Sequence, residues 1–181
     1  MPHVALPAGE PGILGLLGAF RQTERPLNDL ANALMTAESS LSRAERELIA
    51  THVSNRNECR FCSRAHAAAA RHLLGDQQGL VDELMQGNLP STVGKKMEAL
   101  LSIADKVRSD GRLVREMDVR LARDAGADDR AIHDTVLIAA MFSMFNRYVD
   151  GMSTWTPDDP AVYDEIGARI AAHGYGSRFR Q

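Results

Sequence analysis

The chain has 181 residues, of which 44% are hydrophobic and 25% are charged, and its formal net charge at pH 7 is −3. This length and this hydrophobic content suffice for one buried core and predict a single domain. A negative net charge argues against nucleic acid as the main partner, because nucleic-acid-binding surfaces are basic.

The first twenty residues differ in composition from the rest of the chain. Residues 1–12 are rich in proline and glycine and predict an extended arm. Residues 13–20 are mostly apolar, but no basic segment precedes them and the run is too short to cross a membrane. We therefore expect a core segment or one that packs on a neighbouring subunit. We expect no membrane span and no export signal, and hence a cytoplasmic protein.

Helical periodicity accounts for the remaining chain, and no useful stretch shows the alternation of a β-strand. Pro26 is placed at the start of the first helix, where proline is favoured, and Ser42 with Glu45 forms a capping box for the second. We predict an all-α bundle of seven to eight helices, with an N-terminal arm at 1–25, a helical domain at 26–174 and a frayed tail at 175–181. The predicted helices cover 26–37, 43–55, 59–74, 77–87, a stretch from Ser91 or Thr92 to 110, 114–125, 129–150 and 160–172.

The only two cysteines of the chain, Cys59 and Cys62, are separated by two residues. At that spacing their Cα atoms lie roughly 5 Å apart on a helix, within reach of a disulfide. Such a disulfide would close too small a loop to stabilise the fold. The spacing therefore indicates redox or metal chemistry in a reducing compartment. Cys59 begins the predicted helix 59–74, where free N–H groups favour the thiolate.

Two further residues can join the cysteines. Cys62 and His66 are four apart on one helix, so the thiol and the imidazole share a face. Glu47 lies twelve residues before Cys59, which is roughly 18 Å along a straight helix. The polar break at 55–58 lets helix 43–55 fold back against helix 59–74, which would bring Glu47 to His66. A thiol, a histidine and an orienting carboxylate form the nucleophile–base–orienter arrangement.

Three other interpretations remain open from these residues. Glu47 can be an ordinary solvated glutamate on a helix face. His52, Cys59, Cys62 and His66 supply two nitrogens and two sulfurs, enough for a tetrahedral zinc site, although all would come from one short segment. The cysteines can also be inert core residues of a non-catalytic helical oligomer.

Residues 40–66, SLSRAERELIATHVSNRNECRFCSRAH, resemble the core motif of the AhpD-like alkylhydroperoxidases, in the carboxymuconolactone decarboxylase superfamily. The family pattern is a glutamate, eleven intervening residues and then C-x-x-C-x-x-x-H, which Glu47, Cys59, Cys62 and His66 match at every spacing. Residues 128–151 are similar to the second conserved block of the family. The N-terminal arm resembles the peroxidase-related branch.

The resemblance implies an AhpD-like fold and a thiol-dependent hydroperoxide reductase that needs no metal or cofactor. Cys62 would be the peroxidatic thiol, with His66 and Glu47 taking its proton, in part through a bridging water. Cys59 would then close a disulfide that a dithiol reductant, in the family a lipoylated protein, reopens. The resemblance also implies a homo-oligomer, either a trimer or a hexamer.

One residue departs from the family pattern. Some members carry a second histidine just before the second cysteine, and this chain has Phe61 there. An aromatic ring cannot relay a proton, so we expect weaker activation of the thiols. A carboxymuconolactone decarboxylase-like enzyme is the alternative activity within the superfamily, but the relatives that act on lactones lack the cysteine pair.

Overall fold

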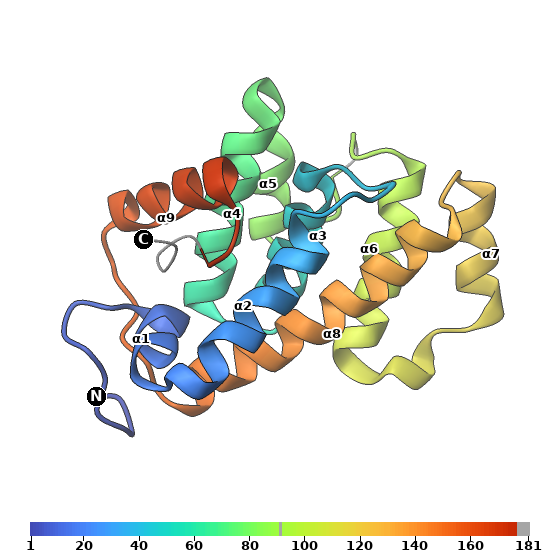
Figure 1. The fold of residues 1–181 in the computed structure, drawn as a ribbon. Helices are drawn as coiled ribbons and strands as arrows, with labels where there is room; N and C mark the ends of the chain where they lie inside the picture. The colour runs from blue at the N-terminus through green and yellow to red at the C-terminus, as the bar shows by residue number, and fades with distance from the viewer. Residues whose placement is uncertain (91, 177–181) are drawn as a thin grey trace.

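The computed structural model describes residues 1–90 and 92–176, and within these ranges it is helical throughout, with no β-strand. The predicted all-α fold class is confirmed. Figure 1 shows α1 and α9 at one end of the molecule and α7 at the other. In the described part of the chain, no helix has the length and apolar character of a membrane span. The helices are α1 (Gly12–Ala19), α2 (Arg21–Met35), α3 (Arg43–Arg56), α4 (Arg60–Leu74), α5 (Gly79–Met85), α6 (Lys95–Asp110), α7 (Glu116–Asp124), α8 (Asp129–Gly151) and α9 (Pro160–His173), with short 3₁₀ turns at Gly75–Gln77 and Gly111–Leu113.

The hairpin of α3 and α4 forms as the polar break predicted. The capping box starts α3, because the Ser42 hydroxyl accepts from the Glu45 N–H at 3.1 Å and the Glu45 carboxylate accepts from the Ser42 N–H at 2.7 Å. Glu58 then adopts the left-handed conformation, with φ of 60°, and reverses the chain. The Cys59 N–H donates to the Ser54 carbonyl at 3.0 Å, so α4 starts directly beside the end of α3.

The N-terminal region contains a helix that the composition did not predict. Residues Gly12–Ala19 form α1, and α2 begins at Arg21, so the predicted start at Pro26 is wrong. Both the N–H and the hydroxyl of Thr23 donate to the Phe20 carbonyl, at 3.1 and 3.0 Å, and they hold the first turn of α2. Pro26 therefore lies inside the helix and costs it one backbone hydrogen bond.

Two other predicted boundaries differ from the structure. Ser91 lies outside the described residues, and the helix expected from Ser91 or Thr92 begins only at Lys95, after Gly94 with φ of 82°. Of the predicted tail, residues 177–181 lie outside the described part, but Tyr175 is fixed on α2. Its N–H donates to the Asn32 side-chain oxygen at 2.8 Å, and its carbonyl accepts from the Asn32 amide group.

The core consists of two clusters that meet along α4 and α8. The larger cluster joins α3, α6 and α8 and includes Leu48, Leu101, Ile138 and Phe142. The smaller cluster surrounds the two cysteines with side chains from α1, α4, α8 and α9. Leu16 of α1 is fully buried there, so the apolar segment at 13–20 contributes to the core of its own chain.

Candidate functional site

Glu47 and His66 meet at the centre of the α3–α4 hairpin. Glu47 Oε2 lies 2.9 Å from His66 Nδ1, and the two residues are 2% and 6% exposed. A buried carboxylate is stable only with partners, so Glu47 is not a solvated helix-face residue. The predicted approach of Glu47 to His66 is confirmed.

Tyr175 is a third member of this group that the sequence did not reveal. Its hydroxyl donates to Glu47 Oε1 at 2.7 Å and lies 3.1 Å from His66 Nδ1. Burial, followed by the nearby negative charge of Glu47, holds the pKa of Tyr175 well above its ordinary value, so the phenol keeps its proton. A lone tyrosine between glycines near the C-terminus has no periodic or spacing signal that could have identified it.

These hydrogen bonds indicate which tautomer a neutral His66 adopts. The single proton of the Tyr175 hydroxyl goes to Glu47 Oε1. The other carboxylate oxygen, Oε2, then accepts from the N–H at His66 Nδ1. In a neutral imidazole this leaves Nε2 as the free acceptor. The ring of Phe142, edge-on at 4.3 Å between centroids, holds the imidazole plane.

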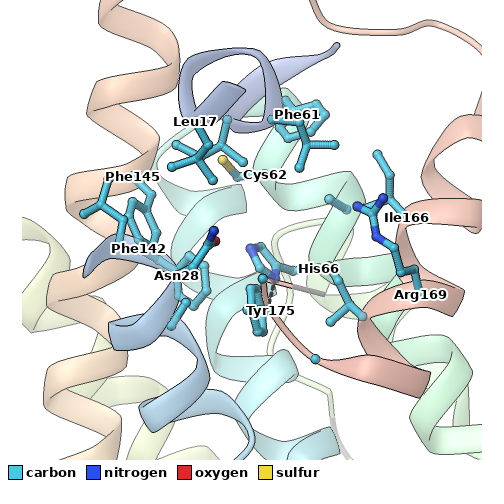
Figure 2. Close-up of a pocket in the computed structure, with 18 residues that line it drawn as sticks. Leu17, Asn28, Phe61, Cys62, His66, Phe142, Phe145, Ile166, Arg169 and Tyr175 are labelled. Atoms are coloured by element: carbon cyan, nitrogen blue, oxygen red, sulfur yellow. Dashed lines mark hydrogen bonds between the residues drawn. The ribbon is translucent and has the colours of Figure 1, made fainter. Parts of the chain in front are cut away.

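Cys62 shares a cavity with His66, whereas Cys59 does not line it. Figure 2 shows both side chains facing this space, with Tyr175 on the opposite side of the imidazole from Cys62. The cavity has a volume of about 100 Å³ and mostly apolar walls. Its lining comprises Ile13, Leu14, Leu17, Leu27, Asn28, Ala31, Phe61, Cys62, Ala65, His66, Phe142, Phe145, Ile166, Arg169, Ile170, Gly174, Tyr175 and Gly176.

Both cysteines are free thiols, and they are 0% and 4% exposed. A hydrogen bond with Cys62, together with burial, raises the pKa of Cys59 far above the ordinary range of a thiol. The expected thiolate at Cys59 is therefore wrong, because burial and this hydrogen bond outweigh the helix N-terminus. The carboxylate of Asp150 at the end of α8 also contacts the Cys59 thiol, and burial raises the pKa of this aspartate.

Phe61 occupies the place of a second histidine and is covered by α1. A Cβ atom at Gly12 would lie 2.1 Å from the Phe61 ring, so the glycine, with φ of 54°, allows the close contact. The other side of the ring faces Tyr163, at 6.0 Å between centroids. Phe61 is thus a wall of the site and relays no proton.

His52 does not join the cysteines. Its Nε2 lies 3.7 Å from a carboxylate oxygen of Asp105 on α6. Burial lowers the pKa of His52 to about 4, although the charge of Asp105 opposes the shift. In residues 1–90 and 92–176, no group of three or more His, Cys, Asp or Glu side chains is arranged to hold a metal ion. The geometry thus gives no support to the zinc interpretation.

Comparison with known proteins shows which family and which solved structures the chain resembles. The sequence profile of the carboxymuconolactone decarboxylase family matches residues 21–106. A peroxidase-related protein from Silicibacter sp. TM1040 is 29% identical, with a TM-score of 0.74 over 85% of this chain and 78% of the other. An AhpD-core, peroxidase-related protein from Ralstonia eutropha JMP134 is 25% identical, with a TM-score of 0.77 over 87% of this chain and 81% of the other. The chain is therefore similar to this family over residues 21–106, and its fold is that of AhpD-like, peroxidase-related proteins.

The superfamily match covers only part of the site. Residues 21–106 contain Glu47, Cys59, Cys62 and His66, but they exclude Tyr175. A protein from Agrobacterium tumefaciens, described as a putative AhpD antioxidant defence protein, shares the AhpD-like fold at 18% identity, with a TM-score of 0.69 over 82% of this chain and 99% of the other. No curated protein matches the chain.

Proposed function

We propose that this AhpD-like protein is a thiol-dependent peroxidase that reduces hydroperoxides through the Cys62–Cys59 pair. The observation that carries the proposal is the buried hydrogen-bonded group of Glu47, His66 and Tyr175, which leaves Nε2 of the imidazole free in the cavity that Cys62 lines. A base oriented by a carboxylate next to a thiol is the arrangement that nucleophilic catalysis requires.

In the first step, His66 Nε2 accepts the proton of the Cys62 thiol. The thiolate attacks the distal oxygen of R–O–O–H, the S–O bond forms and the O–O bond breaks. Cys62 becomes a sulfenic acid and the peroxide leaves as an alcohol, with its proton returned by the imidazolium. The sulfur is oxidised by two electrons and the peroxide is reduced by two.

In the second step, the Cys59 sulfur attacks the sulfenic acid of Cys62. The S–S bond forms, the S–O bond breaks and water leaves. The Asp150 carboxylate contacts the Cys59 thiol and can accept its proton. A dithiol reductant, which we propose to be a lipoyl group on a partner protein, then gives up two electrons and two protons, becomes a disulfide and restores both thiols.

Substitution of each cysteine by serine tests the proposed roles of Cys62 and Cys59. Cys62→Ser should abolish peroxide consumption in stopped-flow assays with dihydrolipoamide. Cys59→Ser should lose turnover but accumulate one sulfenic acid at Cys62, measured by trapping and mass spectrometry. Undiminished turnover in Cys62→Ser would show that another group reacts, and a sulfenic acid on Cys59 in wild type would reverse the two roles.

A further inference from the structure

The two cysteines lie behind α1, although the proposed chemistry requires that a reductant reach them from outside. Cys59 and Cys62 are 0% and 4% exposed. Leu16 of α1 is fully buried in the apolar cluster around them, and Leu17 lines the cavity. Figure 2 shows Leu17 and Phe61 on either side of the Cys62 sulfur. A dithiol on a partner protein must touch a sulfur atom to exchange with it, so a covering element has to move.

The arm of residues 1–11 folds back onto α1. Glycine recurs every three residues in α1, so the glycines share one face of the helix. A Cβ atom at Gly15 would lie 2.7 Å from the Glu10 carbonyl oxygen. A Cβ atom at Gly18 would lie 3.4 Å from Pro7 Cγ. The arm therefore packs against the glycine face, and the two segments form one unit.

Apolar contacts and backbone hydrogen bonds attach this unit to the rest of the molecule. The eight residues of α1 are GILGLLGA, so none of its side chains can form a hydrogen bond or an ion pair. The His3 N–H donates to the Met152 carbonyl at 3.0 Å, and the Gly12 N–H donates to the Trp155 carbonyl at 2.9 Å. A short helix with three glycines also has little stability of its own. Such a segment can detach without global unfolding.

The C-terminal elements around the site are fixed by polar side chains instead. The guanidinium of Arg43 donates to the Ala171 and Ile170 carbonyls near the end of α9, at 2.9 and 2.7 Å. The Tyr175 hydroxyl donates to Glu47 at 2.7 Å. Of the described elements that cover the sulfur atoms, α1 is thus the one whose own side chains hold it by apolar contact alone.

We propose that residues 1–20 form a lid that lifts from the cysteines and admits the dithiol of a partner protein. Phe20, the single residue between α1 and α2, is the hinge. When the lid is closed, Leu16 and Leu17 keep bulky thiols away, whereas the cavity beside Cys62 remains for a hydroperoxide. The exchange with a dithiol rests on the proposed function, but the opening of the lid does not.

Hydrogen exchange tests the opening in the wild-type protein without any reaction at the cysteines. We expect the amides of α1 to exchange together through an opening that leaves α4 and α9 protected, measured by mass spectrometry of peptic peptides under native conditions. Exchange of α1 only together with α4 would overturn the proposal, because the segment would then leave only when the whole chain unfolds.

Two glycine substitutions in α1 should act differently on the lid. Gly12→Ala places a Cβ atom 2.1 Å from the Phe61 ring and forces alanine into a φ of 54°, so the closed lid is strained. Gly18→Ala is the matched control, because its nearest neighbour is a side-chain atom at 3.4 Å and alanine favours a helix more than glycine does. Gly12→Ala should speed hydrogen exchange in α1 but not in α4, and Gly18→Ala should speed neither. An equal rise in α1 and α4 would mean a general loss of stability and would contradict the lid.

The reactivity of Cys62 shows whether the lid controls access for large reagents. N-ethylmaleimide and a polyethylene glycol maleimide carry the same reactive group on bodies of different size. In a Cys59→Ser background, Gly12→Ala should raise the rate with the large reagent about 10-fold relative to the small one, since an L-residue at positive φ costs the closed lid such a factor. Gly18→Ala should leave this ratio at or below the wild-type value. An unchanged ratio in Gly12→Ala would reject the lid, because Cys62 would then be reached by another route.

Reduction of the disulfide separates the lid from the peroxidase. After oxidation with diamide, a polyethylene glycol thiol should reduce Gly12→Ala faster than wild type, whereas 2-mercaptoethanol should reduce both at similar rates. This result in a protein that consumes no hydroperoxide would leave the lid standing and reject the peroxidase. Hydroperoxide turnover that depends on Cys62, with equal rates for the large thiol in the two proteins, would leave the peroxidase standing and reject the lid.

Discussion

Glu47 is the residue at which the hydrogen bonds of the site meet. It accepts hydrogen bonds on both oxygens, from His66 at 2.9 Å and from Tyr175 at 2.7 Å. In the proposed mechanism, its negative charge would stabilise the imidazolium formed when His66 takes the proton of Cys62, since an opposite charge within a few ångströms favours the charged state of a base. The carboxylate would thus act on the thiol through the histidine.

Glu47→Gln should make the thiolate of Cys62 form at higher pH. The amide keeps the shape of the side chain but removes the charge beside His66, so the imidazolium is less stable. We expect alkylation of Cys62 by iodoacetamide, measured in a Cys59→Ser background, to slow by about 10-fold at pH 7 and its pH profile to move to higher pH. Tyr175→Phe keeps the charge and serves as the comparison. An unmoved profile in Glu47→Gln would leave the carboxylate with a purely structural role.

At the scale of elements, the contact between α4 and α9 decides where the C-terminal segment lies. The buried alanines of α4 leave room for α9 to approach closely, and Gly167 of α9 has no Cβ to prevent it. A Cβ at Gly167 would lie 2.6 Å from both the backbone carbonyl carbon and the Cβ of Ala68. Because α9 leads directly to Tyr175, this contact also positions a group that touches Glu47.

Gly167→Ala should therefore destabilise the protein and also slow the reaction of the Cys62 thiol. The added methyl group meets backbone, which cannot move aside, so α9 must shift away from α4. We expect a loss of about 1–3 kcal/mol in urea unfolding, the usual cost of overpacking, together with slower alkylation of Cys62. Gly79→Ala in α5 is the matched control, because nothing lies within 4 Å of its added Cβ. It should be neutral or slightly stabilising.

At the scale of the whole molecule, an early segment of the chain, α1, and a late one, around Tyr175, both pack on the site. Gly12 of α1 packs on Phe61, and Tyr175 returns from α9 to reach Glu47 while Asn32 of α2 holds its backbone. The site therefore depends on segments more than one hundred residues apart. The expected trimer or hexamer, the cytoplasmic location and the division into arm, domain and tail stay predictions.

The buried Tyr175 should stabilise the folded state less at alkaline pH. The folded state raises the pKa of Tyr175, whereas the unfolded phenol titrates near its ordinary value of about 10. Its stabilising contribution is thus fully present below about pH 10 and is lost as the pH rises above that value, by at most about 1.4 kcal/mol per pH unit. Urea unfolding from pH 8 to 11 should show a steeper loss in wild type than in Tyr175→Phe. Parallel curves would place the tyrosine hydroxyl in water.

The sequence alone determined the helical class and the grouping of Glu47, Cys62 and His66. These features follow from local physics: helical periodicity, a capping box, a four-residue spacing and a polar break that reverses the chain. Only the tertiary structure decided that α1 is a helix over Phe61, that Tyr175 completes the hydrogen bonds of Glu47 and that Arg169 enters the cavity. Those contacts join segments far apart in the chain, and no local pattern records which distant surface a side chain will meet.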